Sequence, residues 1–321
     1  MWDVFKTPFG GFAAADFDAY TPEKWSSHLH NRARMGVADK LSAIARQVRE
    51  RLETHGAQFS VEANDARPSV FNGKKVDAQW VFLTRPEADR KQLATLIDKE
   101  HSIQENLHEA GHHKRHLMFG VKVHQDGVEV MLGVHRRAWV DVRNGLRKLA
   151  DGYESDVCAQ LLGQLGATAA GQLHLVGPLG VVPVPSLQVQ DVVDNLKALD
   201  EGQGQWCLWG RNFPVDLELV REEGFAQEIA AIFEALLPLY HFLLWSRQND
   251  HLSLDSALKE KQAEARRGGV TLEPGTSVSV IAGLFSGKTG VVQEIDKKGM
   301  VKVSVGRMVI QVKGTALKVL G

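Results

Sequence analysis

Residues 273–321 alternate apolar and polar side chains between closely spaced glycines, which constrains this segment to a sheet of short strands. In its middle, Val301, Val303 and Val305 occupy every second position. Such a period of two places one set of side chains on a buried face. Five strands are predicted, over residues 278–281, 291–295, 301–305, 308–312 and 317–320. Short strands joined by tight turns predict a small all-β barrel.

The spacing of glycines in this segment carries a second signal. The pattern is Gly275-x-x-Val278-x-Val280-x-x-Gly283-x-Phe285-x-Gly287-Lys288-x-Gly290-x-Val292. It resembles the KOW module of NusG-type transcription elongation factors and of several ribosomal proteins, over the C-terminal 48 residues only. The resemblance implies an SH3-like barrel in which Gly290 is the central glycine, where the chain bends without a Cβ atom. An unrelated SH3-like barrel with the same turns is the alternative.

The predicted barrel is locally basic. It holds seven Lys or Arg against three acidic residues, a surplus of four positive charges in a chain whose net charge is −1. A local cationic surface is typical of phosphate binding. The candidate nucleic-acid contacts are Phe285, Lys288, Lys297, Lys298, Lys302 and Arg307. Phe285 either stacks on a base or fills the barrel. The expected partner is RNA or DNA, or a ribosome-like or RNA-polymerase-like complex.

Residues 1–250 predict an α+β domain, because helices and strands follow one another without steady βαβ alternation. A break near 151–170 would divide it into two subdomains. A helix is predicted over 21–55 and a loop over 177–185, which holds three prolines and two glycines. Residues 251–272 are rich in charge and predict a linker or connecting helix before the barrel.

The clearest hairpin in this domain is predicted over 117–135. Asp126-Gly127 suits a two-residue turn that needs positive φ. That turn pairs His124 with Glu129, Lys122 with Met131 and Met118 with His135. The alternation predicts one buried face and one face available to solvent or a partner.

A histidine motif precedes this hairpin. His108-Glu109-Ala110-Gly111-His112 matches the HExxH signature and resembles the form found in membrane-anchored AAA proteases, over these five residues only. On a helix, His108 and His112 share a face and hold one Zn²⁺, while Glu109 activates water as the catalytic residue. His116 and His135 are further candidate ligands. A polar helix end is the competing interpretation, because Gln104-Glu105-Asn106 lies beside the motif and no AAA module precedes it.

A third interpretation joins the histidines to the hairpin. One basic polar face would contact phosphates or, with Glu129, support acid–base chemistry. Its members are His116, Lys122, His124, His135, Arg136 and Arg137. An ordinary solvated sheet face is the alternative and is favoured.

The remaining features bound the cellular setting. Cys158 and Cys207 have neither metal spacing nor a disulfide framework, so a reducing, cytoplasmic location is expected. No secretory signal is expected at the start of the sequence. The most apolar stretch, Ile229–Trp245, is too short for a membrane span and predicts a buried helix. Three functions remain open: a nucleic-acid-binding accessory protein, a zinc-dependent hydrolase targeted by the barrel, and a protein-interaction adaptor.

Overall fold

The computed structural model describes residues 8–97, 112–253, 274–280, 285, 287–295, 300–306 and 308–319. These residues form two compact units, divided after Leu252. The predicted α+β class is confirmed, with a separate small antiparallel sheet in the second unit. The charged linker predicted over 251–272 lies almost wholly outside the described residues.

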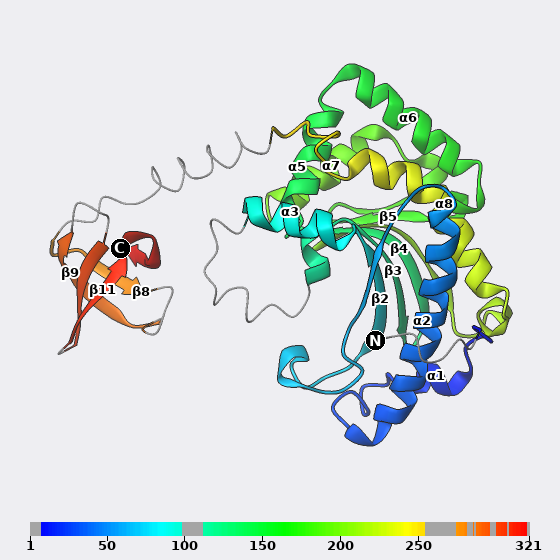
Figure 1. Ribbon diagram of the computed structural model, residues 1–321, viewed down its shortest axis with the longest axis horizontal. Helices are drawn as coiled ribbons and strands as arrows, with labels where there is room; N and C mark the ends of the chain where they lie inside the picture. Colours follow the sequence, from blue (N-terminus) through cyan, green and yellow to red (C-terminus); the bar gives the residue numbers. More distant parts are fainter. Residues whose placement is uncertain are drawn as a thin grey trace. The chain divides into compact units, whose positions relative to one another are not determined.

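A seven-stranded antiparallel sheet forms the centre of the first unit (Figure 1). Its order is β1-β2-β3-β4-β7-β5-β6. The strands are β1 (Ser60–Ala63), β2 (Ala78–Thr84), β3 (Met118–His124), β4 (Gly127–His135), β5 (His174–Gly177), β6 (Gly180–Pro183) and β7 (Trp206–Pro214). Short β1 was not predicted, because its four residues offer too brief an alternation to recognise.

Helices α2 (Asn31–Glu53) and α8 (Phe225–Leu243) cover one face of this sheet. The ring of Phe119 on β3 stacks on Phe233 and Tyr240 of α8, with centroids 4.6 and 5.1 Å apart. These rings, together with the alternate valines and leucines of β2, β3 and β4, form the hydrophobic core. Helix α8 confirms the buried helix predicted from the apolar stretch.

The remaining helices of the first unit are shorter. They are α1 (Ala14–Asp18), α3 (Glu87–Ile97), α5 (Trp139–Leu149), α6 (Gly152–Gly166) and α7 (Val189–Asp200). Single 3-10 turns are η1 (His28–His30), η2 (Val70–Asn72), η3 (His112–Arg115), η4 (Ala169–Gln172), η5 (Val184–Ser186) and η6 (Glu218–Arg221). Helices α5, α6 and α7 gather at one end of the unit (Figure 1).

A buried ion pair joins four segments of this unit. The Arg85 guanidinium donates to both carboxylate oxygens of Asp141, at 2.5 and 2.7 Å, and both side chains are almost fully buried. Asp141 also accepts the backbone N–H groups of Leu117 and Trp245, each at 2.9 Å. The carboxylate therefore ties the end of β2, the start of β3 and the end of α8 to α5.

Two predicted element boundaries are wrong. The helix expected over 21–55 begins only at Asn31. The Arg34 side chain donates hydrogen bonds to the backbone carbonyls of Ala19 and Ser27, which keeps the preceding segment in a non-helical conformation. The loop expected over 177–185 is instead the β5–β6 hairpin, with Pro178-Leu179 as its turn. The prolines lie in the turn and at the strand end, where they remove no hydrogen bond from the ladder.

The predicted β3–β4 hairpin exists, but its register is wrong by two residues. His124 pairs with Gly127 and Lys122 with Glu129, so Gln125-Asp126 forms the turn. Gly127 has φ +152°, and a Cβ atom there would lie 2.2 Å from the carbonyl oxygen of Phe213. The glycine is thus required by its contact with β7 rather than by the turn. A shift of two keeps each side chain on its predicted face.

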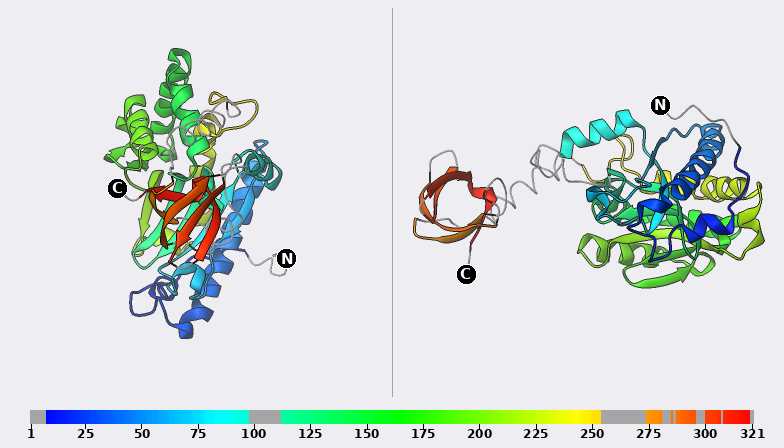
Figure 2. Two further views of the ribbon diagram at one scale, coloured as in Figure 1. Left: turned by 90° about the vertical axis from the view of Figure 1, so that its left-hand side faces the viewer. Right: turned by 90° about the horizontal axis from the view of Figure 1, so that it is seen from below.

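The second unit is a five-stranded antiparallel sheet in the order β11-β10-β9-β8-β12. Its strands are β8 (Ser277–Val280), β9 (Thr289–Ile295), β10 (Met300–Val305), β11 (Met308–Lys313) and β12 (Leu317–Val319), with the 3-10 turn η7 (Gly314–Ala316) before the last. All five strands match the predicted ones closely. Figure 2 shows the strong curvature of this sheet (orange to red), whose inner valines form a separate core.

Helix α8 is the most apolar helix of the described residues, and it lies within the core. A transmembrane span needs a longer uninterrupted apolar helix than any that the described residues form.

Candidate functional site

The second face of the seven-stranded sheet, opposite α2 and α8, carries four of the polar residues that the sequence singled out, namely Lys122, His124, Glu129 and His135. Strand alternation places them there, because Val81, Phe119 and Val130 point to the helices and their neighbours point away. The side chains of the second face include Trp80, Phe82, Lys122, His124, Glu129, Met131, His135 and Trp206.

One cluster on this face centres on Glu129. The ammonium of Lys122 lies 3.1 and 3.2 Å from the two Glu129 oxygens, and His124 Nε2 lies 3.4 Å from Oε1. Lys122 also lies over the ring of Trp80, 5.1 Å from its centroid. The carboxylate neutralises the ammonium, so this cluster is not a basic surface.

A second cluster lies at the far end of β4, where the strand leads into α5. His135 is 4% exposed, and its ring meets the edge of Trp206 with centroids 4.7 Å apart. Its Nδ1 accepts the backbone N–H of Arg137 at 3.1 Å. Lys114 approaches from η3, which contacts β4. We call Lys114, His135, Arg136 and Arg137 the basic corner.

The single basic face was the less favoured interpretation of these residues, and the structure divides its members between two clusters. Six residues of extended strand separate Glu129 from His135, a span of about 20 Å. His116 is also buried, at 8% exposed, so it does not form part of a solvent-facing surface. Lys122 and His124 belong to the first cluster, whereas Arg136 and Arg137 belong to the basic corner.

Burial, reinforced by the charges of Lys114, Arg137 and Arg136, lowers the pKa of His135 to about 4. An unfolded histidine titrates near pH 6.5. The folded state therefore binds fewer protons than the unfolded state between these values. The stability that His135 contributes is complete above about pH 6.5 and is lost as the pH falls toward 4, by at most about 3 kcal/mol.

We expect this titration to appear as a difference between the wild type and His135→Gln. Between pH 7 and pH 4.5, the wild type should lose about 2 kcal/mol more free energy of unfolding than the variant. Denaturant titrations followed by tryptophan fluorescence measure both. Equal losses in the two proteins would mean that His135 titrates normally.

The predicted zinc motif is only partly within the described residues. His108, Glu109 and the side chain of His112 lie outside them. Within the described ranges, no group of three or more His, Cys, Asp or Glu side chains could hold a metal ion. The ring of neighbouring His113 stacks instead on Phe82, with centroids 3.7 Å apart, which fixes η3 against β2.

In the second unit, the candidate contacts occupy different environments. Phe285 is half-buried and packs against the inner valines, which favours a structural role for its ring. Lys288 and Lys302 are exposed, and Lys302 forms an ion pair with Glu294 at 2.6 Å. Lys297, Lys298 and Arg307 lie outside the described residues.

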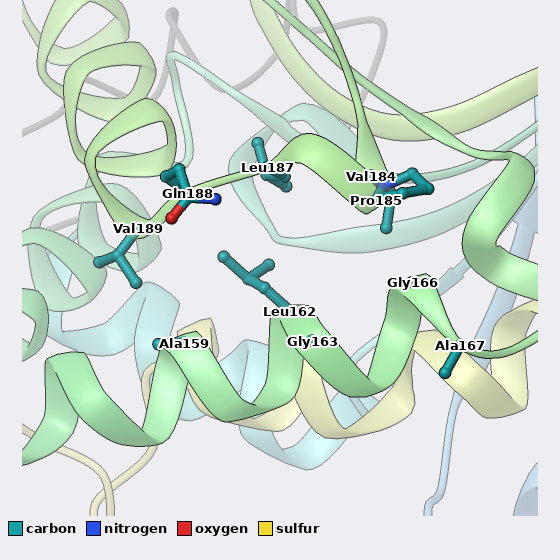
Figure 3. A pocket seen from close by; sticks show the side chains of 10 residues that line it. All are labelled: Ala159, Leu162, Gly163, Gly166, Ala167, Val184, Pro185, Leu187, Gln188 and Val189. Atoms are coloured by element: carbon teal, nitrogen blue, oxygen red, sulfur yellow. The ribbon is translucent and has the colours of Figure 1, made fainter.

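A pocket of about 390 Å³ lies between α6 and the segment that leads into α7 (Figure 3). Leu162 points into it from α6, and Val184 and Leu187 line the opposite side. Gln188 is the polar side chain of its lining. None of the sequence-predicted site residues lines this pocket, and none of its lining side chains is charged.

Sequence reasoning missed two contributors to these clusters. Trp80 was not a candidate residue, although it lies two positions from Phe82 in one strand and so shares its face. Lys114 was not a candidate either, and its approach to β4 depends on the His113–Phe82 stack. That contact joins segments about thirty residues apart and has no local sequence signal.

No family model matches this chain, and no curated protein matches it.

Proposed function

We propose that residues 273–321 form a KOW-type, SH3-like barrel, and that the chain is a cytoplasmic accessory protein that binds nucleic acid through this barrel. The target is RNA or DNA, free or within a ribosome-like or RNA-polymerase-like complex. The α+β unit adds a second contact or a regulatory role.

The packing around Gly290 supports the barrel assignment. A Cβ atom on Gly290 would lie 2.4 Å from the carbonyl oxygen of Ser304 and 2.7 Å from a methyl carbon of Val303. The β9–β10 pairing changes register beside Val303, at a bulge that bends the sheet. A glycine where two strands approach this closely is what the central glycine of the KOW pattern implies.

The suggested nucleic-acid-binding surface is the outer face of β9, β10 and β11. The polar side chains that point away from the inner valines along β10 and β11 are Lys302, Ser304, Gln311 and Lys313. Glu294 of β9 neutralises Lys302, whereas Lys313 is exposed. Val291 and Val309 are 43% and 56% exposed and flank Ser304. Cations beside exposed apolar side chains suit a polyanion whose bases also need apolar contact.

The test compares two double variants of the full chain. We expect Lys288→Gln with Lys313→Gln to weaken binding of a fluorescent single-stranded oligonucleotide, about 20 nucleotides long, by roughly tenfold. Lys74→Gln with Lys75→Gln removes the same charge from exposed sites of the first unit and should change affinity less than about twofold. Fluorescence anisotropy measures both. Equal affinity of the two variants would count against binding through the barrel.

A further inference from the structure

The basic corner brings cations together from two separate segments. Arg136 and Arg137 follow β4 directly and are exposed, and the backbone N–H of Arg136 donates to the carbonyl of Gln205 at 3.0 Å. Lys114 comes from η3, which the His113–Phe82 stack fixes against the second face of the sheet. Both segments are anchored by their backbones or by a stacked ring, so their positions do not depend on the charged groups themselves.

Helix α5 adds a further positive contribution to this corner. It begins at Trp139, two residues after Arg137, and its eleven residues are enough for a substantial macrodipole. Its first-turn acid, Asp141, does not oppose this charge, because Arg85 pairs with it in the interior. The first turn of α5 is largely buried, so its N-terminal pole adds to the positive charge near Arg136 and Arg137 without contacting a ligand itself.

The charged groups that act on His135 at this corner are cationic. In the described part of the chain, the charged neighbours that shift the pKa of His135 are Lys114, Arg137 and Arg136, and all three lower it. Burial is the main cause of the lowered pKa of His135, and the three cations add to it in the direction that also favours an anion beside them. The Glu129 cluster differs, because its carboxylate neutralises its lysine.

We propose that the basic corner binds the phosphate groups of a nucleic-acid strand, and so gives the first unit a nucleic-acid contact of its own. The identity of the ligand as nucleic acid rests on the proposed function of the second unit. Lys114 and Arg136 contact phosphates directly, and Arg137 lies beside Arg136 at the end of β4. Such contacts position a strand without reading its sequence.

The test uses Lys114→Gln with Arg136→Gln in the full chain and the same single-stranded oligonucleotide. Losing two phosphate contacts should reduce the slope of log affinity against log salt by about 1.4 and weaken binding about fivefold near physiological salt. Lys74→Gln with Lys75→Gln is again the matched control. An unchanged slope in a variant whose tryptophan fluorescence shows a folded first unit would overturn the proposal.

A combined variant separates this inference from the proposed function. The basic-corner substitutions are repeated in the Lys288→Gln, Lys313→Gln background. If the background binds like the wild type and only the corner substitutions reduce binding, the corner proposal holds and the proposed barrel function fails. If the corner substitutions have no effect in either background, the corner proposal fails, whatever the barrel does.

Discussion

Replacing Asp141 with alanine should lower the free energy of unfolding of the first unit by about 3–5 kcal/mol. The substitution leaves the Arg85 guanidinium buried without its carboxylate partner, and it removes the acceptor for the backbone N–H groups of Leu117 and Trp245. A buried charge and two buried donors without partners each carry a desolvation cost. Denaturant unfolding followed by tryptophan fluorescence measures the loss, because all seven tryptophans precede residue 250.

Asp200→Ala is the matched control for this prediction. Asp200 pairs with Arg143 at 2.9 Å, but both side chains are partly exposed, so its removal should cost no more than about 1 kcal/mol. Replacing Arg85 with methionine together with Asp141→Leu should recover part of the loss, since no charge is then buried alone. Similar costs for Asp141→Ala and Asp200→Ala would contradict the role assigned to the buried pair.

Gly290→Ala should disrupt the second unit and leave the first unit intact. The new methyl group would overlap the Ser304 carbonyl oxygen, which is backbone and cannot move without breaking the β9–β10 ladder. Overpacking against backbone should cost about 3 kcal/mol or more, a large share of what so small a core provides. Hydrogen exchange by mass spectrometry should then show rapid exchange along β8, β9 and β10, with an unchanged tryptophan fluorescence midpoint.

Gly287→Ala controls for the loss of a glycine in the same unit. Gly287 has φ +83°, but a Cβ atom there meets nothing within 4 Å, so the cost should be only about 1 kcal/mol of backbone strain. Native protection of β9 and β10 in Gly290→Ala would show that this glycine is not required by close strand approach.

The second unit was predictable because its determinants are local. Short apolar runs rich in valine define the strands, and glycines mark turns between them, so all five strands follow from windows of a few residues. The first unit required contacts between distant segments. Helix α2 begins ten residues later than expected because Arg34 binds carbonyls of an upstream segment, which no helical periodicity reveals.

The β3–β4 hairpin shows how a correct residue can be given the wrong reason. Gly127 was assigned to the turn, because Asp-Gly is a strong turn signal. The structure places it in the ladder, where β7 leaves no room for a side chain. The face on which each side chain lies was still predicted correctly, because side-chain direction repeats every two residues. The cross-strand pairing partners were predicted wrongly.

The sequence identified several residues of the candidate site but not how they are arranged in space. Sequence singled out Lys122, His124, Glu129 and His135, yet the pairing of Lys122 with Glu129 depends on a register that was wrong by two. The basic corner depends on η3 approaching β4 through a ring stack, a tertiary contact with no periodic signal.

The salt dependence of oligonucleotide binding by the wild-type chain tests the central proposal most directly. Anisotropy titrations between about 50 and 200 mM salt give the slope of log affinity against log salt. Contacts to at least three phosphates predict a slope of about −2 or steeper for a single strand, and a shallower slope in Lys288→Gln with Lys313→Gln. Absence of binding, or a slope near zero that these substitutions leave unchanged, would contradict nucleic-acid binding through the second unit.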